Sequence, residues 1–133
     1  MKKLSFLFIV LLCFLCVGCA KEKKPEKVDD IKYSVVSDSE IPKELMELIN
    51  EKKDDEFRLT YADGKELYLV VGYGKKDTTG YSVTIQDFYQ TADSLYIDTN
   101  LLGPKEGEDN AKEPSYPWIV VKTAYTDMMV IFG

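Results

Sequence analysis

The sequence of 133 residues contains no histidine and only three cysteines, which limits the chemistry that its side chains can perform. Nucleophilic catalysis by serine–histidine–aspartate or cysteine–histidine sets, and zinc binding through imidazole, all need histidine. The three thiols, Cys13, Cys16 and Cys19, all lie near the start of the chain. The sequence therefore predicts no catalytic residue, no metal site and no cofactor, and we expect a protein that is not an enzyme.

Carboxylates are the remaining acid–base groups, and their spacing matches no specific site. The acidic runs at residues 53–56 and 107–110 lack the alternate-oxygen spacing of a calcium loop, so we interpret both as solvated loops. Gly72 and Gly74 resemble a fragment of a phosphate-binding loop, but a strand end followed by a turn explains them better. A carboxylate pair that hydrolyses glycosides stays open as an alternative, because folding can bring such a pair together from distant positions.

Cys19 is the residue with the clearest predicted chemistry, because of what precedes it. Lys2 and Lys3 are followed by an apolar run over residues 4–17. This run is shorter than the roughly 20 residues of a membrane-spanning helix and is typical of a secretory signal peptide. Val17-Gly18-Cys19 resembles a lipobox, although Cys16 stands where leucine is usual. The resemblance implies cleavage before Cys19 and a diacylglyceryl group on its thiol; an ordinary signal peptide that happens to contain a cysteine is the alternative.

Lipidation of Cys19 would attach the protein to the outer, extracytoplasmic face of a cell membrane, because two acyl chains give stable anchoring. We expect a signal peptide over residues 1–18, the lipidated cysteine and a polar tether over residues 19–30, and a single domain over residues 31–133. Removing the signal peptide removes two lysines and no acid, which changes the formal net charge from −6 to −8. An acidic domain repels nucleic acid and anionic lipid, so membrane contact is expected through the lipid anchor only.

The domain is predicted to be α+β, with a predominantly antiparallel β-sheet of about seven strands and one N-terminal helix packed on the sheet. The helix is expected from Ser39 to Lys53, where apolar residues recur at helical spacing. A hairpin turn is expected at residues 62–65, and a bulge or a kink near Asp87. Strands are expected over residues 31–37, 57–61, 67–73 (buried on both faces), 81–89 and 94–101, and a last hairpin over 116–123 and 128–132.

Two segments stand out as candidate binding residues, separated by a proline loop at residues 100–104. The first is a turn that leads into a strand, and the second is an aromatic segment that begins the last long strand. The residues are Thr78, Thr79, Gly80 and Tyr81 in the first segment and Tyr116, Pro117 and Trp118 in the second.

The order and spacing of these pieces over residues 66–122 resemble the PrcB C-terminal domain family. The matching features are the apolar strand at residues 67–71, Thr79-Gly80-Tyr81, Pro104 in the loop, and the aromatic segment that starts at Tyr116. The family takes its name from an accessory subunit of a surface protease complex and recurs in bacterial lipoproteins. The resemblance implies a non-catalytic module whose partner is another exported protein, such as a protease.

A second resemblance is to chagasin-like inhibitors of papain-family proteases. Residues 78–80 keep the Thr-Thr-Gly of one inhibitor loop, and Pro117-Trp118 keeps the Pro-Trp of another. The arginine before Pro-Trp and the Asn-Pro before Thr-Thr-Gly are absent. An inhibitor would bring both segments to one exposed end, whereas a stabilising partner would need an apolar patch or an open sheet edge. A purely structural role for these residues stays open beside both functions.

Overall fold

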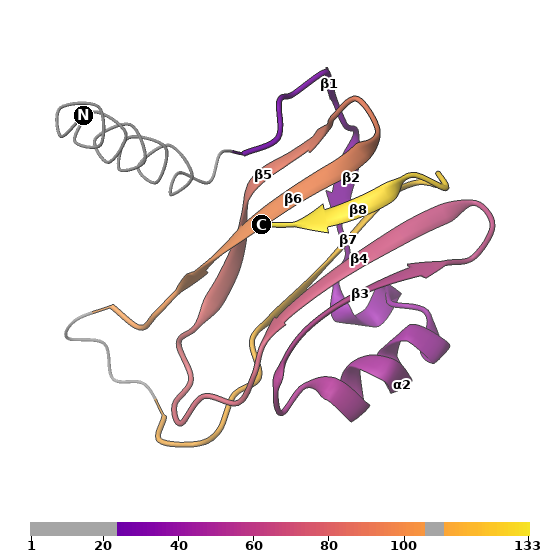
Figure 1. Ribbon diagram of the computed structural model, residues 1–133. Helices are drawn as coiled ribbons and strands as arrows, with labels where there is room; N and C mark the ends of the chain where they lie inside the picture. The colour runs from indigo at the N-terminus through magenta and orange to yellow at the C-terminus, as the bar shows by residue number, and fades with distance from the viewer. Residues whose placement is uncertain (1–23, 106–110) are drawn as a thin grey trace, which may run out of the picture.

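The computed structural model describes residues 24–105 and 111–133, so the predicted signal peptide and Cys19 lie outside the described residues. The described chain contains eight strands, one short 3-10 helix and one α-helix (Figure 1). In chain order they are β1 (Asp29–Asp30), β2 (Tyr33–Val35), η1 (Asp38–Glu40), α2 (Lys43–Lys52), β3 (Glu56–Ala62), β4 (Glu66–Tyr73), β5 (Ser82–Gln90), β6 (Ser94–Leu102), β7 (Trp118–Ala124) and β8 (Met129–Phe132).

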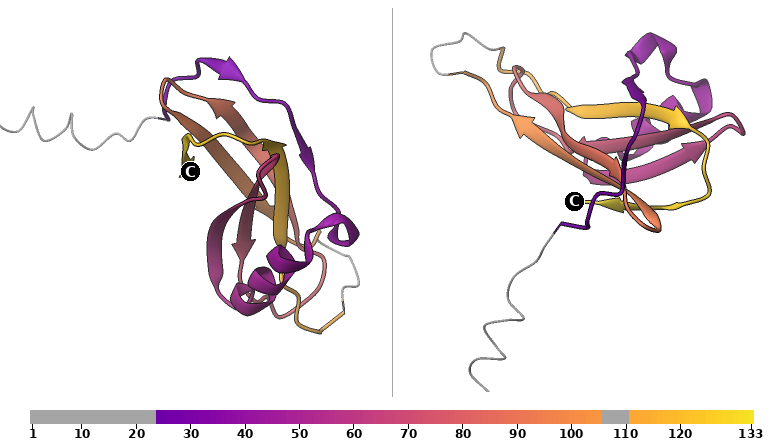
Figure 2. Two further views of the ribbon diagram at one scale, coloured as in Figure 1. Left: turned by 90° about the vertical axis from the view of Figure 1, so that its right-hand side faces the viewer. Right: turned by 90° about the horizontal axis from the view of Figure 1, so that it is seen from above.

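The strands form two four-stranded sheets that face each other, with α2 outside one of them (Figures 1 and 2). Sheet A has the order β1-β5-β6-β8, and sheet B has the order β2-β7-β4-β3. The α+β class and the mostly antiparallel pairing agree with the sequence prediction. The number of strands is eight and not about seven, because the chain before β2 contributes the short strand β1 to the other sheet.

Strand β4 lies inside sheet B and is buried on both faces, as its apolar sequence predicts. Its alternate residues point to opposite sides. Leu67, Leu69 and Val71 belong to the core between the two sheets. Tyr68 and Val70 belong to a second core between sheet B and the helix.

Helix α2 covers the outer face of sheet B with an apolar stripe, which confirms the predicted packing of the helix. Leu45 and Ile49, four residues apart, are completely buried, and Ile41, two residues before the helix, joins the same core. Residues at this spacing lie on one side of a helix. Pro42 stands at the N-cap, where its lack of an N–H leaves no hydrogen bond unmade.

The last predicted hairpin is wrong. After β7 the chain crosses from sheet B to sheet A, and β8 pairs in parallel with β6 over Ser94–Ile97. The crossing lets Val130 and Phe132 pack against the core between the sheets. The sequence supplies two adjacent apolar strands, but the inter-sheet core decides which neighbour the second strand joins.

Two local predictions are confirmed. The register of β5 on β6 shifts between Ile85 and Asp87, which is the expected bulge. The turn between β3 and β4 contains Gly64 at φ +94°. Within it, the Asp63 carboxylate accepts the N–H of Glu66 at 2.8 Å and that of Lys65 at 3.0 Å. An aspartate that binds nearby backbone N–H groups in this way is a common turn former.

The segment expected to be a free tether contacts the domain from Lys24 onward. Asp29 and Asp30 pair with β5, and the Val28 N–H donates to the Gln90 carbonyl at 2.8 Å. Free backbone groups at the edge of β5 favour this pairing despite the polar composition. No helix among the described residues is long and apolar enough to cross a membrane.

Gly72 generates the first testable prediction, because Phe57 lies directly opposite it on β3. A Cβ at Gly72 would come within 2.1 Å of the Phe57 ring, so the ring occupies the space of the missing side chain. We expect Gly72→Ala to lower the free energy of unfolding by about 1–3 kcal/mol, measured by denaturant titration. The control is Gly103→Ala, whose nearest atom would be 3.7 Å away. Equal stability of the two variants would contradict the close packing.

Asp63 generates a prediction about pH. The N–H groups of Glu66 and Lys65 hold the pKa of its carboxyl below the ordinary value of 3.8. A lowered native pKa means that the ionised carboxylate stabilises the fold above the unfolded pKa, and that this contribution is lost as the pH falls through the native pKa. Asp63→Ala should therefore lower the denaturation midpoint at neutral pH and have a shrinking effect below pH 3.8. A pH-independent effect would contradict this origin, and the exposed Asp127→Ala serves as the control.

Candidate interaction site

The two segments predicted to bind come together at one end of the sandwich. The connection between β4 and β5 runs beside the chain that precedes β7 (Figure 1). Lys76 and Ser115 exchange both backbone hydrogen bonds, with N···O distances of 2.8 and 2.9 Å. We call residues 74–81 and 111–117 the loop cluster.

Thr78 and Thr79 fasten the two halves of the loop cluster. The Ser115 hydroxyl donates to the Thr78 carbonyl at 2.6 Å. The Thr79 N–H donates to the Ala111 carbonyl at 3.1 Å, and the Thr79 hydroxyl accepts the Ala111 N–H at 3.1 Å. Thr79 thus takes part through its side chain and Thr78 through its backbone carbonyl, and the loop conformation is held by hydrogen bonds between distant parts of the chain.

Gly80 and Tyr81 direct the chain from the loop cluster into β5. Gly80 has φ +97°, a conformation that side-chain-bearing residues rarely adopt. Tyr81 is half-buried, and its ring lies 3.7 Å from the position that a Cβ would take at Gly103. The chain that follows β6, which contains the predicted proline loop, therefore lies at the same end of the molecule as the two predicted segments.

Tyr116 and Pro117 connect the loop cluster to sheet B and to the helix. The ammonium of Lys53, just after α2, lies 4.4 Å from the centroid of the Tyr116 ring. Such a cation over an aromatic face contributes about 0.5–1 kcal/mol at an exposed site. The Tyr73 N–H donates to the Pro117 carbonyl at 3.0 Å, and β7 begins at the next residue.

Trp118 lies apart from the other predicted residues. It is the first residue of β7, pairs with Gly72, and packs half-buried against the core under the helix. Packing alone accounts for a tryptophan at this position, because a large aromatic side chain fits the space beside its cross-strand glycine. The other six predicted residues gather in the loop cluster; their role in binding stays a prediction.

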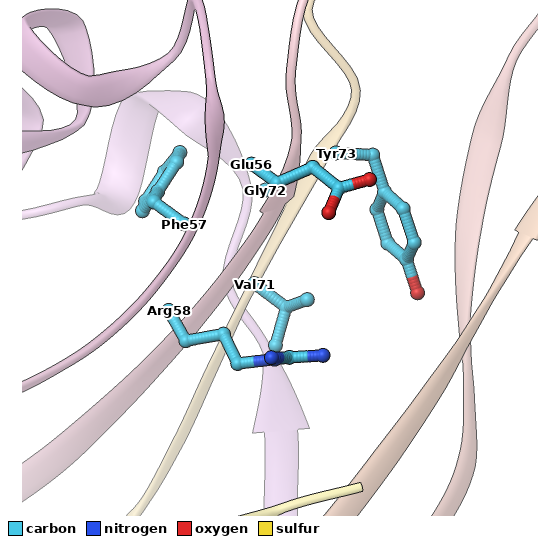
Figure 3. A pocket seen from close by; sticks show the side chains of 6 residues that line it. All are labelled: Glu56, Phe57, Arg58, Val71, Gly72 and Tyr73. Atoms are coloured by element: carbon cyan, nitrogen blue, oxygen red, sulfur yellow. The ribbon is translucent and has the colours of Figure 1, made fainter.

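Sequence reasoning missed a hollow on the inner face of sheet B, shown in Figure 3. Its lining is Glu56, Phe57, Arg58, Val71, Gly72 and Tyr73. Cross-strand pairing places Glu56 beside Tyr73 and Arg58 beside Val71. Tyr73 shares a hydrogen bond of 2.5 Å with the Thr99 hydroxyl. The alternation of charged residues on β3 was the available signal, but only the strand register puts them on this face.

A groove also separates the free edges of β3 and β8, which sequence reasoning could not locate. Leu67, Met128 and Phe132 contribute its apolar surface. Arg58 spans from β3 toward the end of β8, where its guanidinium donates to the Gly133 carbonyl at 3.4 Å. Within residues 24–105 and 111–133, no three metal-binding side chains gather in one place.

Residues 67–124 match the family model described as PrcB C-terminal, which confirms the predicted resemblance. The match runs from β4 through β7 and includes the loop cluster and Trp118. No curated protein and no solved structure matched the chain.

Ser115 tests how the loop cluster is held. Ser115→Ala removes the donor to the Thr78 carbonyl, which costs about 1 kcal/mol for a typical hydrogen bond. We expect the Thr79 amide to exchange its hydrogen faster, measured by hydrogen–deuterium exchange with NMR. Ser82→Ala, at an exposed position of the adjacent strand, is the control. Unchanged exchange at Thr79 would mean that the backbone bridge alone holds the loops.

Proposed function

Given that residues 67–124 match the PrcB C-terminal family, we propose that this protein is a lipid-anchored, extracytoplasmic and non-catalytic module that associates with an exported protease. The family supports a protease-associated accessory role. The loop cluster is the proposed contact surface, because it is the part of the family match where the β4–β5 and β6–β7 connections meet.

The observation that carries this proposal is the pre-formed conformation of the loop cluster. Hydrogen bonds of Lys76, Thr78 and Thr79 to residues 111–115 fix both halves before any partner binds. A surface held in one conformation loses little conformational entropy on association, and this favours its use in recognition. Exposed polar groups of the cluster and the half-buried rings of Tyr81 and Tyr116 then supply contacts.

Anchoring through Cys19 belongs to the same proposal, although Cys19 lies outside the described residues. Two acyl chains would hold the protein at the outer face of a membrane. The partner would therefore be a protein exported to, or attached at, the same surface.

Inhibition of a papain-family protease is the second candidate function. The observation that favours it is that Thr78–Tyr81 and Tyr116–Pro117 share one end of the molecule, as an inhibitor requires. The position of Trp118 beside the helix core weakens the comparison, because this residue does not project from a loop. The open edges of β3 and β8 favour instead an accessory partner that supports its protease.

A capture experiment with matched charge reversals tests the proposed contact surface. The bait is the lipid-free mature chain from Ala20 to Gly133, exposed to envelope extract and analysed by mass spectrometry. Lys75→Glu/Lys112→Glu reverses two exposed charges in the loop cluster. We expect this variant to lose at least tenfold enrichment of an exported protease, since reversing two contact charges costs more than about 1.4 kcal/mol.

The control is Lys43→Glu/Lys65→Glu, which makes the same change of net charge at exposed positions, at the start of α2 and in the β3–β4 turn. This variant should keep the partner. Loss of the partner from both variants would mean that net charge, and not the loop cluster, controls association. If no protease is enriched by the unchanged bait, the protease link is wrong. Activity of the captured enzyme, measured with and without the bait, separates an accessory subunit from an inhibitor.

A further inference from the structure

The polar segment before β2 lies along sheet A instead of extending freely from the domain. The first described residue, Lys24, already contacts the sheet, and its ammonium lies 2.6 Å from the Asp87 carboxylate on β5. The hydroxyl of Tyr89 donates to the Pro25 carbonyl at 2.6 Å. The Val28 N–H and the pairing of β1 with β5 complete the attachment. We call residues 24–30 the strap.

Charge explains why the strap docks at this place. Asp87 and Asp98 stand directly opposite each other on β5 and β6, and like charges in this position destabilise a sheet. Lys24 supplies a cation to this pair, and its hydrogen bond to Asp87 raises the pKa of the lysine above its ordinary value. Lys27 makes no comparable contact with the sheet, because its partner is Asp30 within the strap itself.

Burial gives a second reason for docking. Tyr89 and Tyr96 pair across β5 and β6 on the outer face of sheet A, with ring centroids 5.1 Å apart. Their exposed fractions are only 8% and 6%, although no second sheet or helix of residues 24–105 and 111–133 covers this face. The strap contacts Tyr89 directly, so it covers part of an aromatic pair that would otherwise face water.

Docking shortens the stretch of sequence between the predicted anchor and the first described contact with the domain. Cys19 is twelve residues before Ile31 but only five before Lys24. At about 3.3–3.6 Å per extended residue, the reach falls from roughly 40 Å to roughly 17 Å. The shorter maximum distance restricts how far the domain can rotate relative to the membrane.

We propose that the strap fixes the orientation of the domain, so that the outer face of sheet A is the membrane-facing surface of the protein. This inference rests on the proposed anchoring at Cys19. The strap enters on the side of sheet A that is opposite to α2, and the loop cluster lies away from the point of entry (Figures 1 and 2). Met129 and Ile131, which are 69% and 36% exposed, lie on this outer face beside the strands that the strap covers.

The orientation leaves the proposed contact surface accessible to a partner. Helix α2 and sheet B lie on the far side of sheet A from the bilayer, and the loop cluster extends beyond the end of β5. The membrane-facing surface therefore contains neither the loop cluster nor the groove between β3 and β8.

The first experiment measures orientation with the processed full chain in phosphatidylcholine vesicles that carry a trace of headgroup-labelled acceptor lipid. A fluorescent donor is placed at Met129→Cys on sheet A or at Glu47→Cys on α2, both exposed positions. We expect stronger energy transfer from position 129 than from position 47. In Lys24→Ala/Tyr89→Phe, which removes two strap contacts and keeps the buried ring, this difference should be lost. Equal transfer from both positions in the unchanged chain would overturn the proposed orientation.

The second experiment measures the strap itself and does not depend on the lipid. In Lys24→Ala/Tyr89→Phe, the Val28 amide should exchange its hydrogen roughly three- to tenfold faster, as expected from the loss of one hydrogen bond and one surface ion pair. Lys27→Ala, with the same loss of charge, should leave that exchange unchanged. Unprotected exchange at Val28 in the unchanged chain would overturn the strap while leaving the anchor intact. Protected exchange in a chain whose mass shows no acyl group would keep the strap and overturn the anchoring and the orientation together.

Discussion

The burial of β4 on both faces is the constraint on which the rest of this structure depends. A strand that is apolar on both sides needs two covering layers, and the chain provides sheet A on one side and α2 on the other. Within sheet B, β4 lies between β7 and β3, and the burial of both faces specifies the register of these pairs, because a shift by one residue would move every side chain to the opposite face. The loop cluster is one result, since β4 and β7 meet at the end where Gly72 pairs with Trp118.

That end of the molecule combines tight packing with exposed polar chemistry. Phe57 fills the space over Gly72, while the neighbouring Gly74, at φ +80°, turns the backbone away from the sheet. The threonines that follow bind the chain that returns toward β7. A family match that spans this region is therefore explained by structure, because the residues proposed to contact a partner also close this end of the sandwich.

Charged residues determine how the strap binds to the outer face of sheet A. The acidic composition predicts repulsion from nucleic acid and lipid, but it also brings two aspartates together across β5 and β6. Lys24 partly neutralises the negative charge of this pair. The lysine belongs to a segment whose composition predicts a solvated tether. A charged segment docks here because its cation and its backbone groups both find partners on the sheet, and neither partner is adjacent in sequence.

The sequence alone determined the α+β class, the positions of the helix and most strands, the Asp63 turn and the bulge near Asp87. Each of these follows from side-chain periodicity or backbone preference within a few residues, such as the spacing of Ile41, Leu45 and Ile49. The tertiary structure alone decided that β8 joins β6, that Trp118 supports the helix core, and that residues 24–30 lie on sheet A. Those outcomes depend on pairing between residues as far apart as Lys24 and Asp87, and local patterns carry no information about which distant edge or charge is free.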